Sequence, residues 1–291
     1  MPSAFVGLRP GESGFEKQIG EILREANNLS AEEVQNIVLY QQEHNIKFGE
    51  AAMALGLVNQ EEVLWALSQQ FHYAYANQAI DQLGPELVIA HKPFCEQSEI
   101  FRGIRSHLCS TLFSNKQQRA ALAVTSTESG DGKTFFAANL AVGFSQLGGR
   151  TLLIDANMRA PRLHDVFGVE NRVGLSGVLS RRAGSSVIKR VNGLPGLYVL
   201  PVGIVPPNPL ELLQSQAFEL LLKVVVSKFD YVLVDTPSGS AGIDARVIAA
   251  NCGAAVAIAR KDKTRTDALR NLLGPLSRGS VNMTGVVMNE Y

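Results

Sequence analysis

The chain has 291 residues, of which 46 % are apolar, enough for two packed domains at about 150 residues each. Lysine plus arginine and aspartate plus glutamate both number 27, so the formal net charge is zero and nucleic acid is not an expected partner. Three cysteines without CxxC spacing and five scattered histidines favour a reducing compartment and no structural metal. The first residues, MPSAFVGLRPGESG, lack signal-peptide features, and no run of ~18 apolar residues is present. We therefore expect a cytoplasmic protein with no integral membrane segment.

Two segments are expected to lie outside the packed domains. Residues 1–14 contain Gly, Pro and Ser with little apolar periodicity, which indicates a mobile tail, with a docking role as the alternative. Residues 76–95 contain Gly84-Pro85 and Pro93, which is typical of a linker. The domains are then residues 15–75 and residues 96–291.

The first domain carries an ungapped repeat. Gly20-Glu21 recurs 29 residues later as Gly49-Glu50. In both copies a polar residue stands three places before a glutamate, in Ser30-x-x-Glu33 and Asn59-x-x-Glu62, which is the spacing of the capping box that begins a helix. We predict a small all-helical domain over residues 15–75.

This repeat resembles the amino-terminal domains of type II secretion and pilus ATPases, whose repeats read G-E-x-L-x-x-x-G-x-(I/V). Some members of that family bind cyclic di-GMP and tend to carry an arginine two places before the repeat glycine. This chain has Gln18 and Lys47 there. A second-messenger site and a protein-docking module are the two alternatives for this domain.

The second domain alternates short apolar runs with longer helical stretches, which predicts a parallel sheet with helices on both faces. The fold class is therefore α/β. The expected strands are Ala121–Thr125, Leu152–Asp155, Leu197–Val202, Tyr231–Asp235, Ala254–Ala259 and Thr284–Met288.

A phosphate loop follows the first of these strands. After ALAVTS come Thr127-Glu128-Ser129-Gly130-Asp131-Gly132-Lys133-Thr134 and a helical run, so backbone N–H groups and the positive end of a helix point at one place. The loop departs from GxxxxGK[ST] only in Thr127, the position of the first glycine. Lysine at this position reaches the β- and γ-phosphates and the hydroxyl ligates Mg²⁺. The predicted ligands of ATP are Ser129, Gly130, Asp131, Gly132, Lys133, Thr134 and Phe135.

Two further strands end in aspartate, at Asp155 and at Asp235. Such carboxylates lie at the carboxyl edge of the sheet, where ligands of open α/β sheets bind. With Thr134 they form the predicted Mg²⁺ site. Asp155 has two alternative roles, orienting the metal or accepting the proton of an incoming hydroxyl.

Together these motifs resemble the bacterial tyrosine kinases of polysaccharide export, or BY-kinases, a P-loop NTPase family with the MinD/ParA-like fold. The likeness is to the EpsG-type chain-length-determinant kinases over the whole chain. It rests on the Walker A motif at Gly130–Thr134, the LLIDxDxR motif at Leu152–Arg159, the Walker B motif at Val232–Pro237, and Pro206-Pro207-Asn208-Pro209-x-Glu211-Leu212-Leu213. The resemblance implies an ATP-dependent protein-tyrosine autokinase that regulates exopolysaccharide polymerisation, export and chain length. It implies catalytic roles for Lys133, Asp155, Asp235 and Arg159.

The resemblance also implies partners. The family's oligomerisation motif E-x-x-R-x-x-R is present as Glu99, Arg102 and Arg105, so we expect a ring-shaped homo-oligomer. A solvated surface stripe is the alternative. Family members without membrane segments work with a membrane chain-length determinant through its cytoplasmic tail, which would place this chain peripherally at the inner face of the plasma membrane.

Two departures from the family leave alternatives open. Asn157 replaces the second aspartate of LLIDxDxR, and one tyrosine, Tyr291, replaces the carboxy-terminal cluster as the candidate phospho-acceptor. A nucleotide-gated assembly subunit with little kinase activity is one alternative. A MinD/ParA-like partition ATPase is another, although Glu128 stands where those proteins carry a signature lysine.

Overall fold

The computed structural model describes residues 19–70, 82–114 and 120–290. The chain divides into two compact units, Met1–Tyr73 and Ala74–Tyr291, each of which is described by itself. The expected tail of residues 1–14 and the candidate acceptor Tyr291 lie outside the described residues. No helix among the described residues is both long and apolar enough to span a bilayer.

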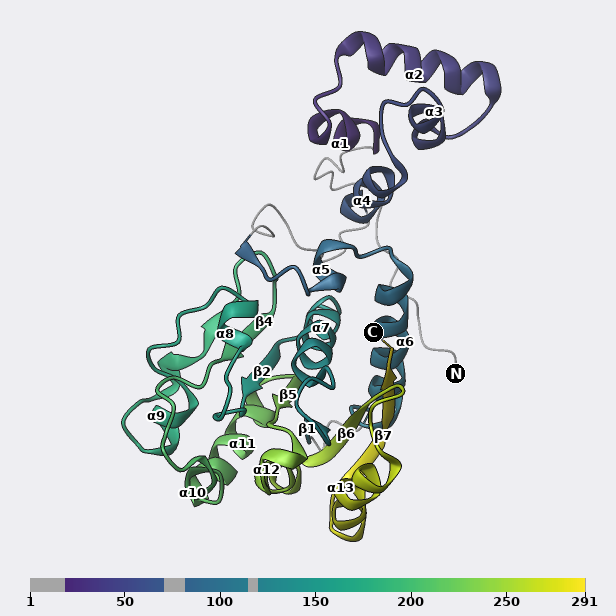
Figure 1. Cartoon of the computed structure of the whole chain (residues 1–291). Helices are drawn as coiled ribbons and strands as arrows, with labels where there is room; N and C mark the ends of the chain where they lie inside the picture. Colours follow the sequence, from purple (N-terminus) through teal and green to yellow (C-terminus); the bar gives the residue numbers. More distant parts are fainter. Residues whose placement is uncertain (1–18, 71–81, 115–119, 291) are drawn as a thin grey trace, which may run out of the picture. The chain divides into compact units, whose positions relative to one another are not determined.

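The described part of the first unit is helical and repeats as the sequence predicts (Figure 1). Its helices are α1 (Ile19–Ala26), α2 (Ala31–His44), α3 (Phe48–Ala54) and α4 (Gln60–Gln70). Both capping boxes are formed: Glu33 N donates to Ser30 Oγ at 3.2 Å, and Glu62 N donates to Asn59 Oδ1 at 2.9 Å. The glutamates accept from the backbone N–H of Ser30 and Asn59 at 2.8 and 2.7 Å.

Equivalent positions of the two copies form the core of this unit. Leu23 and Ile37 in the first copy and Ala52 and Ala66 in the second are all fully buried. Lys47 occupies one of the two positions where family members that bind cyclic di-GMP tend to carry arginine. It is the N-cap of α3, and its backbone N–H donates to Glu50 Oε2 at 2.9 Å. The other position, Gln18, lies outside the described residues.

The second unit contains a seven-stranded sheet in the order β3-β4-β2-β5-β1-β6-β7. Every neighbouring pair is parallel except β3 with β4. The two-residue β3 is absent from the sequence prediction because a strand so short has no recognisable pattern. The strands are β1 (Ala121–Ser126), β2 (Thr151–Asp155), β3 (Lys189–Arg190), β4 (Leu197–Leu200), β5 (Tyr231–Asp235), β6 (Gly253–Arg260) and β7 (Asn282–Asn289).

Helices cover both faces of this sheet, as expected (Figure 1). In β1, Leu122 and Val124 join the core of one face, and Ala121 and Ala123 join the core of the other. Helices α5 to α8 pack on the first face and α9 to α13 on the second. The helices are α5 (Val88–His91), α6 (Glu96–Thr111), α7 (Lys133–Ser145), α8 (Leu163–Val166), α9 (Leu175–Leu179), α10 (Pro209–Leu213), α11 (Gln216–Lys228), α12 (Asp244–Cys252) and α13 (Thr266–Arg278).

The segment expected to be a linker, residues 76–95, differs from the expectation over its described part. Leu87 and Ile89 are fully buried in the core on the α7 side of the sheet, and α5 forms within this segment. A four-residue helix between turns gives no periodic pattern from which burial could be predicted. Residues 82–95 therefore belong to the packed α/β unit.

Candidate functional site

The phosphate loop lies between β1 and α7, at the carboxyl edge of the sheet. Gly130 and Gly132 have φ angles of 82° and 97°, a left-handed backbone that glycine adopts without strain. Asp131 closes the loop, since its Oδ2 accepts from Glu128 N at 2.8 Å and from Thr127 Oγ1 at 3.3 Å. Thr127, at the position of the motif's first glycine, therefore has a bonding role of its own.

Lys133 is buried inside this loop. Its Nζ donates to Ser126 Oγ at 2.8 Å and to the carbonyl of Glu128 at 3.1 Å. Burial lowers the pKa of Lys133, and the nearby carboxylate of Asp235 opposes that shift. An ammonium has three N–H donors, so two are held by the loop and the third can bind an anion.

Thr134 and Asp235 form the part of the site that fits a magnesium ion. Thr134 Oγ1 donates to Asp235 Oδ2 at 2.6 Å, while Asp235 Oδ1 is buried without a hydrogen-bond partner among the described residues. A buried carboxylate oxygen is normally bonded, so an orphaned one next to a hydroxyl suits a cation or its water. No group of three or more His, Cys, Asp or Glu in the described ranges could hold a metal alone. Mg²⁺ bound to nucleotides needs only one or two carboxylates besides phosphates and water.

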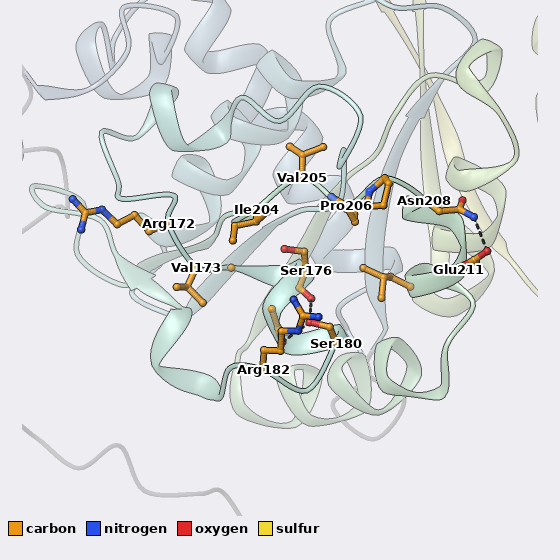
Figure 2. A pocket seen from close by; sticks show the side chains of 14 residues that line it. Arg172, Val173, Ser176, Ser180, Arg182, Ile204, Val205, Pro206, Asn208 and Glu211 are labelled. Atoms are coloured by element: carbon orange, nitrogen blue, oxygen red, sulfur yellow. Dashed lines mark hydrogen bonds between the residues drawn. The ribbon is translucent and has the colours of Figure 1, made fainter.

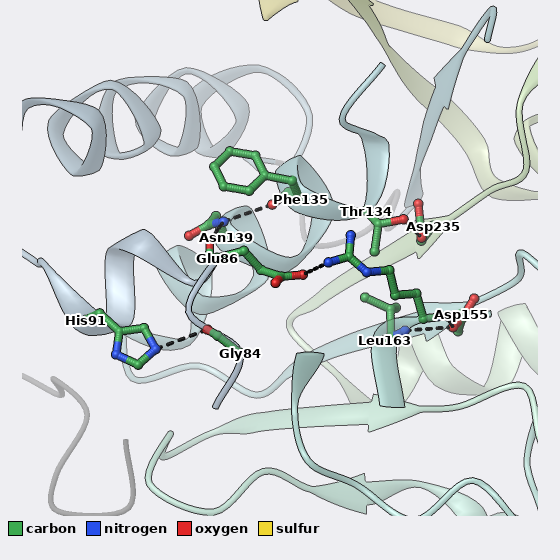
Figure 3. Close-up of polar contacts among 10 residues, drawn as sticks. Gly84, Glu86, His91, Thr134, Phe135, Asn139, Asp155, Leu163 and Asp235 are labelled. Atoms are coloured by element: carbon green, nitrogen blue, oxygen red, sulfur yellow. Dashed lines mark hydrogen bonds and ion pairs between the residues drawn. The ribbon is translucent and has the colours of Figure 1, made fainter. Parts of the chain in front are cut away.

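Asp155 is directly opposite Asp235 on the adjacent parallel strand. Three backbone N–H groups hold its carboxylate at 3.1 Å, from Asn157 to Oδ1 and from Arg162 and Leu163 to Oδ2. Burial, and secondarily the charge of Asp235, raises the pKa of Asp155 to about 7. Burial raises the pKa of Asp235 to about 6, against the lowering effect of the Thr134 hydrogen bond. The site therefore contains two buried carboxyl groups on adjacent strands (Figure 3), both with pKa values raised toward neutral pH.

The other predicted site residues have intrachain partners. Arg159 binds Asp244 at the start of α12 through two contacts, Nε to Oδ2 at 2.5 Å and a terminal nitrogen to Oδ1 at 3.2 Å. Asn157 closes a turn with Ala160, donating from Nδ2 to its carbonyl at 2.9 Å and accepting from its N–H at 3.2 Å. Ser129 is exposed on the loop. The ring of Phe135 packs 6.0 Å from that of Phe101 in α6, so only the backbone of Phe135 would be available to a nucleotide.

The predicted oligomerisation residues lie on α6. Arg102 contacts Glu99 and the carbonyl of Pro93, and a terminal nitrogen of Arg105 donates to the carbonyl of Gly143 in α7 at 2.7 Å. Glu99 is 65 % exposed. The two arginines therefore have bonds within the chain, and their pairing with another subunit stays a prediction.

Three residues at the site have no sequence signal that predicts them. Asn289, at the end of β7, donates to the carbonyl of Asp131 in the phosphate loop at 3.0 Å. Glu86 accepts from a terminal nitrogen of Arg162 at 2.6 Å, beside Thr134, Asp155 and Asp235 (Figure 3). These contacts join residues far apart in the sequence, so no local motif could reveal them.

A separate pocket of about 460 Å³ lies between α9 and the loop after β4 (Figure 2). Pro206, Pro207, Asn208, Glu211 and Leu212 of the family-like stretch line it. Its wall requires Gly174, where a Cβ atom would lie 2.1 Å from the carbonyl oxygen of Pro201. The family-like stretch therefore builds a pocket distinct from the phosphate loop.

Comparison with known proteins adds four findings. Residues 122–291 match the CobQ/CobB/MinD/ParA nucleotide binding domain family. The tyrosine-protein kinase YwqD of Bacillus subtilis (strain 168) is 33 % identical over 198 residues, covering 68 % of this chain and 83 % of that protein. The kinase domain of the Escherichia coli tyrosine kinase ETK superposes with a TM-score of 0.67 at 27 % identity, over 76 % of this chain and 92 % of that one. The septum site-determining protein MinD of Pyrococcus horikoshii OT3, solved with Mg-ADP, shares the fold at a TM-score of 0.52 and 22 % identity, over 58 % of this chain and 70 % of that one.

Proposed function

This chain belongs to the family of bacterial tyrosine-protein kinases built on the CobQ/CobB/MinD/ParA nucleotide-binding domain, and we propose that it phosphorylates protein tyrosines to regulate exopolysaccharide polymerisation, export and chain length. The observation that carries the proposal is the Thr134–Asp235 contact beside a buried, unpartnered carboxylate oxygen. It provides a place for a nucleotide-bound cation directly after a phosphate loop.

In this proposal each residue of the phosphate loop and of the strand ends has its own role in phosphoryl transfer. Backbone N–H groups of Gly130 and Gly132 and the ammonium of Lys133 bind the phosphates. Thr134 and Asp235 would hold Mg²⁺, which would neutralise charge on the transferred phosphoryl group when bound with ATP. Asp155 would accept the tyrosine hydroxyl proton, and the three backbone N–H groups that bind its carboxylate would orient it for that role. Arg159 positions the loop after β2 against α12 through Asp244.

We extend the proposal to partners and location. The resemblance to EpsG-type kinases supports a cytoplasmic chain that works at the membrane with a chain-length determinant, whose cytoplasmic tail activates it. It also supports a ring in which Glu99, Arg102 and Arg105 face a neighbour and Tyr291 is the acceptor. Gel filtration across a range of concentrations, with and without Mg-ATP, tests the ring; monomer under all conditions would contradict it.

A second candidate function is a nucleotide-gated assembly subunit with little phosphorylation. Asn157 favours it, because an amide that closes a turn with Ala160 replaces a carboxylate of the family motif. In this function ATP binding would change docking to the membrane partner without transfer to tyrosine.

One experiment separates the two functions. Purified chain is incubated with labelled ATP and Mg²⁺, with and without the partner's cytoplasmic tail, and phosphotyrosine is mapped by mass spectrometry. We expect label on tyrosine that is lost in Lys133→Ala and retained in Lys223→Ala, a change of an exposed lysine that pairs with Glu219 on α11. Nucleotide binding without label under every condition would favour the assembly subunit.

A further inference from the structure

The segment of the second unit that precedes α6, residues 82–91, is bonded to the elements of the nucleotide site; we call it the strap. Asn139, fully buried in α7, donates from Nδ2 to the carbonyl of Glu86 at 2.9 Å and accepts from Ile89 N at 3.2 Å. Gly84 N donates to the carbonyl of Val166 after β2 at 2.7 Å. The backbone of Glu86 is therefore held between the helix of the phosphate loop and the segment that follows Asp155 (Figure 3).

Arg162 reaches this strap from the other side of the site. Its backbone N–H donates to Asp155 Oδ2 at 3.1 Å, so its Cα is fixed beside the carboxylate proposed to accept the proton. Its guanidinium binds Glu86 Oε1 at 2.6 Å. The positive charge of Arg162 also opposes the rise in the pKa of Asp235, which puts the guanidinium within electrostatic reach of the Mg²⁺ end of the site.

The ion pair between Glu86 and Arg162 can be replaced by a contact from Arg162 to a phosphate at little cost in stability. The arginine side chain is 57 % exposed and the glutamate 22 %, and such half-exposed ion pairs stabilise a fold little. A guanidinium has five N–H donors, and phosphate oxygens bind it as well as a carboxylate does, with more negative charge. Because the backbone of Arg162 is fixed beside Asp155, which the proposed function sets next to the reacting tyrosine, the guanidinium is on the side of the site that the terminal phosphate of ATP would occupy. ADP lacks this phosphate.

We propose that Arg162 is a sensor of the γ-phosphate and that Glu86 binds Arg162 when this phosphate is absent. With ATP the guanidinium leaves Glu86 for the terminal phosphate, and with ADP it stays on Glu86. Arg162 is then a specificity-determining residue, and Glu86 lowers the affinity for ATP by competing for it. This inference rests on the proposed function, because it requires ATP at the phosphate loop.

The test compares dissociation constants of fluorescent ADP and of a fluorescent non-hydrolysable ATP analogue, both with Mg²⁺, on the full chain. Arg162→Gln should weaken the ATP analogue about tenfold and leave ADP nearly unchanged, since one charge-assisted contact to phosphate is lost. Glu86→Gln should tighten the ATP analogue about two- to fivefold and leave ADP nearly unchanged, because the competitor is gone. Arg162→Lys, which keeps the charge and loses the planar fork, should fall between wild type and Arg162→Gln.

The matched controls are Arg172→Gln and Glu170→Gln, which break an exposed Arg–Glu pair with a 3.3 Å contact elsewhere on the unit. Both should bind the two nucleotides as wild type does. Equal weakening of ADP and ATP analogue by Arg162→Gln, or any weakening by Glu86→Gln, would overturn the inference and leave the proposed function standing. Wild-type chain that binds neither nucleotide would overturn the proposed function and the inference together.

Discussion

Asp155 and Asp235 lie opposite each other on the neighbouring parallel strands β2 and β5, and both carboxyl groups are buried. Their pKa values are raised to about 7 and about 6 from an ordinary 3.8. In the absence of a cation the folded chain therefore holds protons that the unfolded chain has released. This relationship makes the stability of the nucleotide-free chain dependent on pH.

The sign of that dependence follows from proton linkage. Between pH 3.8 and about 7 the folded state binds more protons than the unfolded state, so the free energy of unfolding should fall as pH rises and level off above about 7. Thermal unfolding in EDTA at several pH values checks this. Asp155→Asn should flatten the profile, and the exposed-site control Asp267→Asn should not. Parallel profiles for wild type and Asp155→Asn would contradict the prediction.

Loss of the Thr134 hydroxyl should expose the role of Asp235. Thr134→Val keeps the shape but removes the 2.6 Å hydrogen bond to a buried carboxylate, so we expect a loss of about 1–3 kcal/mol in the free energy of unfolding. The Mg²⁺ dependence of nucleotide binding should also disappear. Thr134→Ser is the control that retains the hydroxyl. If Thr134→Val and Thr134→Ser had equal stability and equal Mg²⁺ dependence, the assigned contact would be wrong.

The sequence predicts those parts of the site that local patterns encode. Apolar runs ending at Asp155 and Asp235 predict two strand ends at the carboxyl edge of the sheet, and the loop before Lys133 predicts a helix amino terminus. That the two strands are neighbours is seen only in the structure. The partners of these residues are not encoded locally. The contact from Arg159 to Asp244 spans 85 positions, and the contact from Asn289 to the phosphate loop spans 158. Only the folded sheet brings such residues together.

For the same reason the sequence predicts a linker where the structure has the packed strap. Its burial depends on Asn139, whose amide serves Glu86 and Ile89 from another element. Asn139→Ala would remove the acceptor of Ile89 N and one of the two donors to the Glu86 carbonyl, which keeps its bond from Val88 N at 2.9 Å, so we expect a loss of about 1–3 kcal/mol in the free energy of unfolding. Asn251→Ala is the control, because the Asn251 amide bonds only within its own helix, to the carbonyl of Val247. Equal denaturant midpoints for the two variants would show that the strap is not held by this amide.

The pocket beside α9 depends on close backbone contact at Gly174. A Cβ atom there would lie 2.1 Å from the carbonyl oxygen of Pro201 and 2.5 Å from Gly203 N, both backbone atoms with little freedom to move. Gly174→Ala should therefore cost about 1–3 kcal/mol in chemical denaturation. Gly184→Ala, where nothing lies within 4 Å of the new atom, should change the free energy of unfolding by less than about 0.5 kcal/mol. Similar midpoints for both variants would contradict the close contact.

Asn157→Asp, which restores the carboxylate of the family motif, should lower the free energy of unfolding and raise the affinity for Mg²⁺. In Asn157→Asp the 2.9 Å bond from Nδ2 to the carbonyl of Ala160 is replaced by repulsion between two oxygen atoms, and a negative charge is added close to Asp155. Without Mg²⁺ we expect the free energy of unfolding to fall by about 1 kcal/mol. With Mg²⁺ and nucleotide the added charge should tighten the metal severalfold, as measured by Mg²⁺ titration of nucleotide fluorescence. Asn157→Ala loses the same turn without adding charge, so it should lose stability and gain no affinity for Mg²⁺. If both variants gave the same Mg²⁺ curve, residue 157 would act through the turn alone, and its departure from the family motif would not weaken the metal site.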